Sequence, residues 1–376
     1  MRAQVLNDPA LAKHAGRFAW LSINSEDARN AAFIEKVPLD GFPTFLVIDA
    51  ATEQVALRWY GSLTGTQFER LLDDGERAVA AGGGEPAEMA LARADRLQAE
   101  RKAALASKQY EEAIRLAPSG WARRGRAVES LIFALRKAGE LEACAATAQK
   151  ESPGLERGPS FANAATTGLS CALDAPKEAP WRAGSLAVLE PLVKESLTLD
   201  TVLADDRSSA YEMLRDARQQ GGDEAGAREM AAAWLGFLET ESGKAPDLET
   251  RAAFDSHRVA AALALGDPAR AVPALLASER DLPDDYNPPA RLAVLYRELG
   301  RYDEAIEAAD RALARAYGPR KLRIYDTKSQ IYVKMGDAAS ARRTLEEGLR
   351  FAEGLPTSQQ PARLVEQLRK KLAAGG

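Results

Sequence analysis

Two stretches near the C-terminus repeat one pattern, and this repeat constrains the fold more than any other feature of the chain. Residues 289–305 and 325–341 each have the pattern of a helix, a turn that contains glycine, and a second helix. The turn glycines Gly300 and Gly336 lie 36 positions apart, and Gly266 lies 34 positions before Gly300. One helical pair cannot bury its apolar face alone, so a repeat of this length predicts a stack of pairs.

The residues at the expected helix contacts agree with this pattern. Ala293, Ala305 and Ala312 are small where the two helices of a unit would touch, and Tyr296 and Tyr302 are large enough to fill wider gaps. Period and residue placement resemble the tetratricopeptide repeat, whose period is about 34 residues. The resemblance implies a protein-interaction scaffold, in which the first helices of successive pairs line a concave surface that binds a peptide or protein partner.

Helical patterns extend well beyond the two clear repeats, which cover residues 288–352. We expect a mainly α fold, with an α-solenoid of about seven helical pairs over residues 87–376 and a polar cap helix at 360–373. Residues 86–108 and residues 248–265 each have the pattern of one continuous helix. Pro191 is expected to bend or break a helix over 182–197, because proline removes a backbone hydrogen bond.

Residues 1–80 differ from the rest and form an α/β segment. Strands are predicted at 18–23, 44–48 and 54–60, with helices at 26–35 and 64–80. A Gly-rich linker at 81–86 separates this segment from the solenoid.

The segment Leu39-Asp-Gly-Phe-Pro-Thr-Phe-Leu-Val-Ile-Asp49 resembles the Gly-x-Pro-Thr region of the thioredoxin superfamily. Pro43 would occupy the position of that family's cis-proline, and Phe42, Pro43 and Thr44 would contact a substrate peptide. The alternative interpretation, which we favour, is that Pro43 only shapes the turn. The resemblance covers residues 1–80 and implies an incomplete thioredoxin-like domain.

The redox motif of that family, Cys-x-x-Cys, does not occur in the sequence. The strand that should precede it is also missing, so we interpret the start of the chain as internal to an ancestral domain. Without a thiolate at that site the sequence as given should not exchange disulfides. The leading hypothesis is therefore a non-catalytic scaffold. The alternative is a thiol–disulfide oxidoreductase whose Cys-x-x-Cys lies upstream of the given start.

The two clear repeats supply candidate residues for a partner-binding groove. By their place on the first helices, the side chains expected on the concave surface are Asn287, Arg297, Arg323, Asp326 and Gln330. They do not match the Lys/Asn pattern that clamps a peptide carboxylate in some tetratricopeptide repeats. An ordinary solvated face is the alternative for each of them, because mixed charge along a helix is typical of solvent exposure.

Composition narrows the remaining classes of function. The formal net charge is −5, with both signs interspersed, which argues against nucleic acid as the main partner. No apolar run is long enough to span a membrane, so membrane insertion is not expected. No phosphate-binding loop or metal-ligand spacing occurs, so no cofactor or metal is predicted. Adjacent acidic residues such as Asp205-Asp206 are expected to cap helices or face solvent.

The two cysteines, Cys144 and Cys171, lie on neighbouring predicted helices. We expect buried free thiols, because cysteine packs as a small hydrophobe. A structural disulfide is the alternative and would imply an oxidising compartment. No signal peptide is apparent, so localisation stays open between the cytoplasm for the sequence as given and the periplasm for a longer form.

Overall fold

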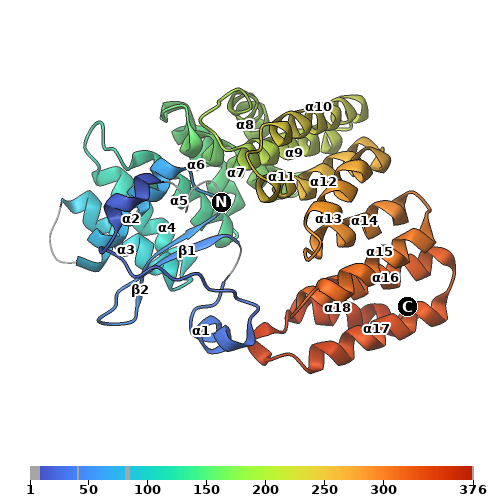
Figure 1. Cartoon of the computed structure of the whole chain (residues 1–376). Helices are drawn as coiled ribbons and strands as arrows, with labels where there is room; N and C mark the ends of the chain where they lie inside the picture. Colours follow the sequence, from blue (N-terminus) through green and yellow to red (C-terminus); the bar gives the residue numbers. More distant parts are fainter. Residues whose placement is uncertain (1–8, 40–41, 81–84, 375–376) are drawn as a thin grey trace. The chain divides into compact units, whose positions relative to one another are not determined.

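The computed structural model describes residues 9–39, 42–80 and 85–374 (Figure 1). By their contacts these residues form two compact units, and each is described here by itself. Unit 1 consists of the described residues within 1–15 and 41–237, and unit 2 of those within 16–40 and 238–376. The boundaries predicted from composition, at residues 80 and 86, stay a prediction.

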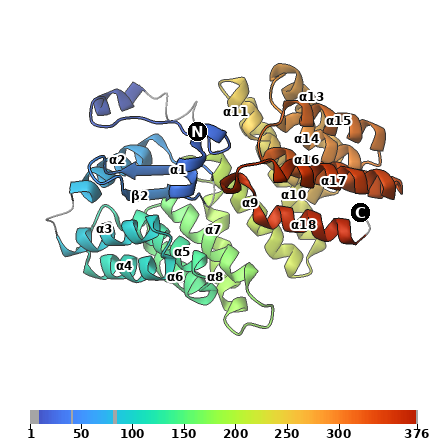
Figure 2. The same cartoon turned by 90° about the horizontal axis from the view of Figure 1, so that it is seen from below.

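Unit 1 begins with a short 3-10 helix at Pro9–His14 and a β-hairpin, and it continues as helical pairs. Its strands are β1 (Thr44–Ile48) and β2 (Val55–Tyr60), and its helices are α2 (Gly65–Ala80), α3 (Pro86–Ala99), α4 (Ala103–Leu116), α5 (Arg124–Lys137), α6 (Leu141–Glu151), α7 (Pro159–Asp174), α8 (Arg182–Ser196), α9 (Ala204–Gln220) and the greater part of α10 (Glu224–Gly243). The pairs α3/α4, α5/α6 and α7/α8 stack side by side, as Figure 2 shows.

Unit 2 contains a small N-terminal helix and the later helical pairs. Its helices are α1 (Ala31–Lys36), α11 (Leu248–Ala253), α12 (Asp255–Leu265), α13 (Val272–Asp281), α14 (Asn287–Glu298), α15 (Tyr302–Arg315), α16 (Arg320–Met335), α17 (Ala338–Glu353) and α18 (Ala362–Ala373). Val365 and Leu368 of α18 are buried in a cluster with Leu322 and Leu345 of α16 and α17. The predicted cap helix therefore covers an apolar face that the preceding pair leaves open.

Turn glycines behave as the repeat predicts. Gly266, Gly300 and Gly336 end α12, α14 and α16 with φ angles of 77°, 72° and 80°. This left-handed conformation is strained for other residues but free for glycine, so it ends a helix and starts the return. Ala293, Ala305 and Ala312, predicted at helix contacts, are fully buried.

Three helix predictions need correction. The single helix predicted over 86–108 is two helices, because the backbone reverses at Glu100–Lys102, where Arg101 has a φ of 62°. Pro191 does not break its helix, since α8 continues through it. The predicted helix over 248–265 is interrupted at Phe254, between α11 and α12.

The N-terminal prediction is confirmed only in its second half. β1 and β2 pair antiparallel, and Thr64 caps α2 through a reciprocal contact with Gln67. The strand predicted at 18–23 is wrong, because those residues form no strand. The sheet of the described residues has two strands and is not identifiable as thioredoxin-like.

One apolar core runs through the helical pairs of unit 1. It extends from Ala87 on α3 to Ala217 on α9, and many of its members are alanines that are hardly exposed. Alanine at helix contacts lets backbones approach closely, which gives each pair a tight inner contact. The first helices of the pairs then share one face, and that face carries the candidate site.

Candidate functional site

A cavity of about 370 Å³ lies on the inner face of unit 1. We call it the inner cavity and define it by residues from β2, from the ends of α3 and α4, and from α5, α7 and α9. The last three are the first helices of successive pairs. A volume near the lower end of known ligand sites, roughly 300–1,000 Å³, suits one or two side chains or a small molecule.

Each of the three helices supplies a stripe of residues, most of which are three, four or seven positions apart. The stripes are Glu129, Phe133 and Arg136 on α5; Asn163, Thr166, Thr167 and Ser170 on α7; and Asp206, Ser209 and Met213 on α9. Residues at this spacing share one face of a helix. Seven residues span about 10.5 Å along a helix axis, so the cavity is about two turns long.

Strand β2 forms the wall opposite the helices. Tyr60 stacks on Phe133 of α5 with 5.2 Å between ring centroids, and the Lys137 ammonium lies over both rings. Arg58 and Trp59 also line the cavity, and both are buried. The hairpin therefore closes one side of the inner cavity, which stays open to solvent on another.

Two carboxyl groups meet at the end of the cavity near the helix N-termini. Asn163 donates a 2.8 Å hydrogen bond from Nδ2 to Oε1 of Glu129. A side-chain hydrogen bond between Asn163 and Asp206 favours the ionised form of Asp206. Burial raises the pKa of Glu129 from 4.5 to about 7. The pKa of Asp206 rises from 3.8 to about 7, first through burial and then through the charges of Glu129 and Asp205.

Two side chains that line the cavity carry a buried oxygen without a hydrogen-bond partner in the protein. Gln98 is 6% exposed and its Oε1 is unpaired. Oε2 of Glu129 is unpaired as well. Buried polar atoms are nearly always hydrogen-bonded, so both oxygens can accept a donor from water or from a ligand.

A buried ion network holds the hairpin segment to the helical pairs beside the cavity. Arg126 of α5 contacts Asp74 of α2 at 3.1 Å and Asp95 of α3 at 2.6 Å, and Arg123 contacts Asp74 at 2.8 Å. Burial opposes the ionisation of Asp74, but the arginines outweigh it and lower its pKa. Tyr110 donates a 2.9 Å hydrogen bond to Asp95, which joins the network to the cavity wall.

The predicted groove residues lie in unit 2, and several of them contact one another. Nη1 of Arg297 donates to Oε1 of Gln330 at 2.7 Å, and Nε2 of Gln330 donates to Asp326 at 2.9 Å. Lys371 of α18 reaches the second Asp326 oxygen at 2.5 Å. Asn287 instead bonds to Asp285 at the start of α14, and Arg323 is exposed. Whether this surface binds a partner stays a prediction.

The predicted peptide contact at Phe42, Pro43 and Thr44 lies at the start of β1. The Phe42–Pro43 peptide bond is cis, and Phe42 is 71% exposed. The carbonyl of Pro43 accepts a 2.9 Å hydrogen bond from the backbone of Gly61, which closes the hairpin. Their proposed role as a peptide contact also stays a prediction.

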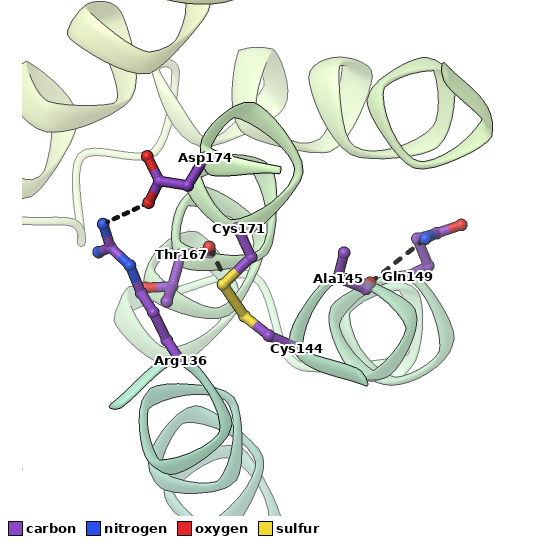
Figure 3. The surroundings of a disulfide bond; sticks show 7 residues. All are labelled: Arg136, Cys144, Ala145, Gln149, Thr167, Cys171 and Asp174. Carbon is purple, nitrogen blue, oxygen red and sulfur yellow. Dashed lines mark hydrogen bonds and ion pairs between the residues drawn. A yellow bond between two sulfur atoms is a disulfide. The ribbon is translucent and has the colours of Figure 1, made fainter. Parts of the chain in front are cut away.

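The expectation of two free thiols is wrong in this structure. Cys144 of α6 and Cys171 of α7 are fully buried and form a disulfide, with their Cα atoms 6.3 Å apart (Figure 3). Nearby, Arg136 of α5 pairs with Asp174 of α7 at 3.0 Å, and Thr167 of α7 presents its carbonyl to Cys144 (Figure 3). The disulfide therefore joins two adjacent helical pairs next to the cavity.

Sequence reasoning missed the inner cavity. The prediction that Asp206 lies at a helix end is correct, because it lies in the first turn of α9. Its partner Glu129 was not singled out in the sequence. The available signal was the stripe of polar residues on each first helix of unit 1. Within the described ranges no group of three His, Cys, Asp or Glu side chains could hold a metal ion. No described helix is both long enough and apolar enough to cross a membrane.

The chain was compared with curated proteins and with solved structures. A search of curated proteins finds no match to this sequence. Among solved structures, a tetratricopeptide repeat protein from Parabacteroides merdae has a TM-score of 0.48 at 12% identity, covering 78% of this chain and 99% of that chain. The TPR2AB domain of yeast Sti1 in complex with pHSP90 has a TM-score of 0.29 at 19% identity, covering 77% and 100%. The Cut9–Hcn1 hetero-tetramer of the APC/C has a TM-score of 0.26 at 13% identity, covering 80% and 59%.

A family model matches one part of the sequence. Residues 286–354, which contain α14 to α17, match the model of the family "Tetratricopeptide repeat". This part of the chain is therefore similar to tetratricopeptide repeats, and the other described residues of both units are also mainly helical.

Proposed function

We propose that this chain is a non-catalytic scaffold that binds a peptide or protein partner on the inner face of its helical pairs. The observation that carries the proposal is the inner cavity, where two buried oxygen atoms, Oε1 of Gln98 and Oε2 of Glu129, lack a partner. Leaving such atoms unpaired costs about 1–3 kcal/mol each, and a partner that supplies the missing hydrogen bonds would recover that cost. Repeat proteins commonly use such inner surfaces for binding.

The cavity wall adds a second argument. Tyr60 and Phe133 form an aromatic face beside hydroxyl and amide side chains such as Ser209 and Asn163. Aromatic surface with a few fixed polar groups is the usual composition of a binding pocket. Since the cavity spans about two helical turns, it suits a side chain with a short stretch of its backbone.

The test is a peptide selection with the purified full chain. A displayed peptide library should yield binders, and Ser209→Trp, which fills the cavity from α9, should weaken them about tenfold or more. Ala233→Trp places the same bulk on an exposed position of α10 and should leave affinity unchanged. Binders that ignore Ser209→Trp would move the site away from the cavity. A library with no binders would refute the scaffold proposal.

The predicted groove of unit 2 is kept as a second proposed surface. Arg297, Gln330 and Asp326 already contact one another, so they would present a preorganised polar face. Arg323 is exposed beside them, and Arg323→Ala should weaken partners that use this groove. An unchanged partner affinity would remove this surface from the proposal.

The alternative function, thiol–disulfide exchange, is not carried further. It depends on a Cys-x-x-Cys motif upstream of the given start, and no residue of the given sequence favours it. Cys144 and Cys171 are joined to each other and fully buried, so neither offers a thiolate to a substrate. An insulin-reduction assay of this chain should show no activity.

A further inference from the structure

We propose that the inner cavity binds a cationic side chain of the partner, an ammonium or a guanidinium, between the carboxyl groups of Glu129 and Asp206. This inference rests on the proposed scaffold function and names the chemistry of its partner. It is carried by the arrangement of acidic groups, unpaired atoms and aromatic rings in one cavity.

The acidic groups are placed to surround a small cation. Glu129 comes from α5 and Asp206 from α9, with Asn163 of α7 between them. The lining contains three carboxyl groups, Glu129, Asp206 and Glu212, and two guanidinium groups, so its formal charge is 2 − 3 = −1 when all are ionised. Arg136 is already paired with Asp174, about two turns away from Glu129 along α5. The end of the cavity that holds the carboxyl pair is thus the acidic one.

The unpaired atoms point to the same class of ligand. Oε2 of Glu129 and Oε1 of Gln98 are acceptors that lack a donor, and the Gln98 residue is only 6% exposed. Ammonium and guanidinium groups carry only donors, so they match both acceptors.

The aromatic wall suits the stem of such a side chain. Tyr60 and Phe133 are stacked on each other, and Lys137 of this chain already lies 5.4 Å from the Phe133 ring centroid. Lysine and arginine bury their methylene stems on apolar surface while the charged head binds a polar group. A partner side chain can therefore lie along the rings and place its charge at the carboxyl pair.

A purely structural role is the competing explanation. In that case Glu129 and Asp206 would share a proton and hydrogen bonds with Asn163 and would bind nothing. The two explanations differ in one measurable respect, because only a binding site discriminates a charged ligand from a neutral one of the same shape.

The experiment uses calorimetry with the full chain and a blocked amino acid, N-acetyl-arginine amide. N-acetyl-citrulline amide, which has nearly the same shape without the charge, is the matched probe. We expect the arginine probe to bind at least about tenfold more tightly than the citrulline probe. The variant with Glu129→Gln and Asp206→Asn should abolish this preference, whereas Glu229→Gln on the exposed face of α10 should retain it.

The probes make the result independent of whether the double variant folds, because arginine and citrulline are compared on the unmodified chain. Equal binding of both probes, or binding of neither, would overturn the inference. Selected peptides that bind in the cavity but tolerate citrulline in place of arginine would overturn it while leaving the scaffold proposal intact. Arginine binding without any selected peptide would support the cation site and count against the scaffold.

Discussion

Replacing Glu129 with glutamine should stabilise the chain at neutral and alkaline pH. Burial raises the pKa of this carboxyl from 4.5 to about 7 in the folded chain, so the folded state holds the proton more tightly than the unfolded state. The stabilisation is fully present below about pH 4.5 and is lost as the pH rises through 7. Glutamine keeps the Oε1 acceptor for Asn163 but never ionises, so the variant avoids that loss.

The size of the effect follows from the two pKa values. Their difference, about 2.5, corresponds to about 3.4 kcal/mol at about 1.36 kcal/mol per pKa unit. Water in the cavity screens the charge, so we expect about 1–3 kcal/mol in practice. Part of the rise in the pKa of Asp206 comes from the charge of Glu129, so the two carboxyls titrate as a pair. Asp206→Asn should therefore stabilise the chain less in the Glu129→Gln variant than in the unmodified chain.

Other titratable groups surround Glu129 and Asp206. The Glu129→Gln variant and the unmodified chain both contain them. They are Arg58 on β2, Tyr110 on α4, Arg126 and Arg136 on α5, and Asp205 and Glu212 on α9. Taking the difference between variant and unmodified chain largely removes their contribution.

The assay is urea unfolding of both proteins at several pH values between about 5 and 9, followed by circular dichroism. The advantage of Glu129→Gln should grow from about pH 5 to about pH 7, where the unfolded chain has lost the proton and the folded chain still holds it, and should level off above about pH 8. A difference in unfolding free energy that stays constant over this range would refute the raised pKa. If Glu129→Gln stabilises the chain and the cation site is also confirmed, the carboxyl pair lowers the stability of the folded chain and serves binding.

Three further predictions concern packing and cross-links in unit 1. Gly168→Ala would place a Cβ 2.2 Å from that of Ala148 and should lower the free energy of unfolding by about 1–3 kcal/mol. Gly184 has open space around it, so Gly184→Ala should raise the free energy of unfolding by up to about 1 kcal/mol in the same assay. Removing both cysteines of the disulfide opens a 27-residue loop and should cost about 3.5 kcal/mol, measured against the oxidised chain. Asp74→Asn leaves buried arginines without their full charge partner and should cost about 3 kcal/mol above pH 5; a loss under 1 kcal/mol would show that the network is dispensable.

The helical pairs were largely predictable because their signals are local. Apolar and small residues at helical spacing indicate which face is buried, and a glycine with positive φ marks several of the sharp turns, as Gly300 and Gly336 show. Errors occurred where local signals conflict with packing. Arg101 adopts a positive φ without being glycine, so nothing in the pattern marks the break between α3 and α4. The strand expected at 18–23 had an apolar run but found no neighbouring strand to pair with.

The amino-acid sequence alone determined the repeat architecture, because periodicity and turn chemistry act within about 35 residues. Tertiary structure decided what the repeats bring together. Glu129 and Asp206 are 77 positions apart, and only the stacking of three helical pairs places them on either side of Asn163. The same stacking brings Cys144 and Cys171 together as a disulfide, which the sequence alone did not decide. It also packs β2 against the inner face. Contacts between distant segments depend on how whole helices pack, and no local pattern records that packing.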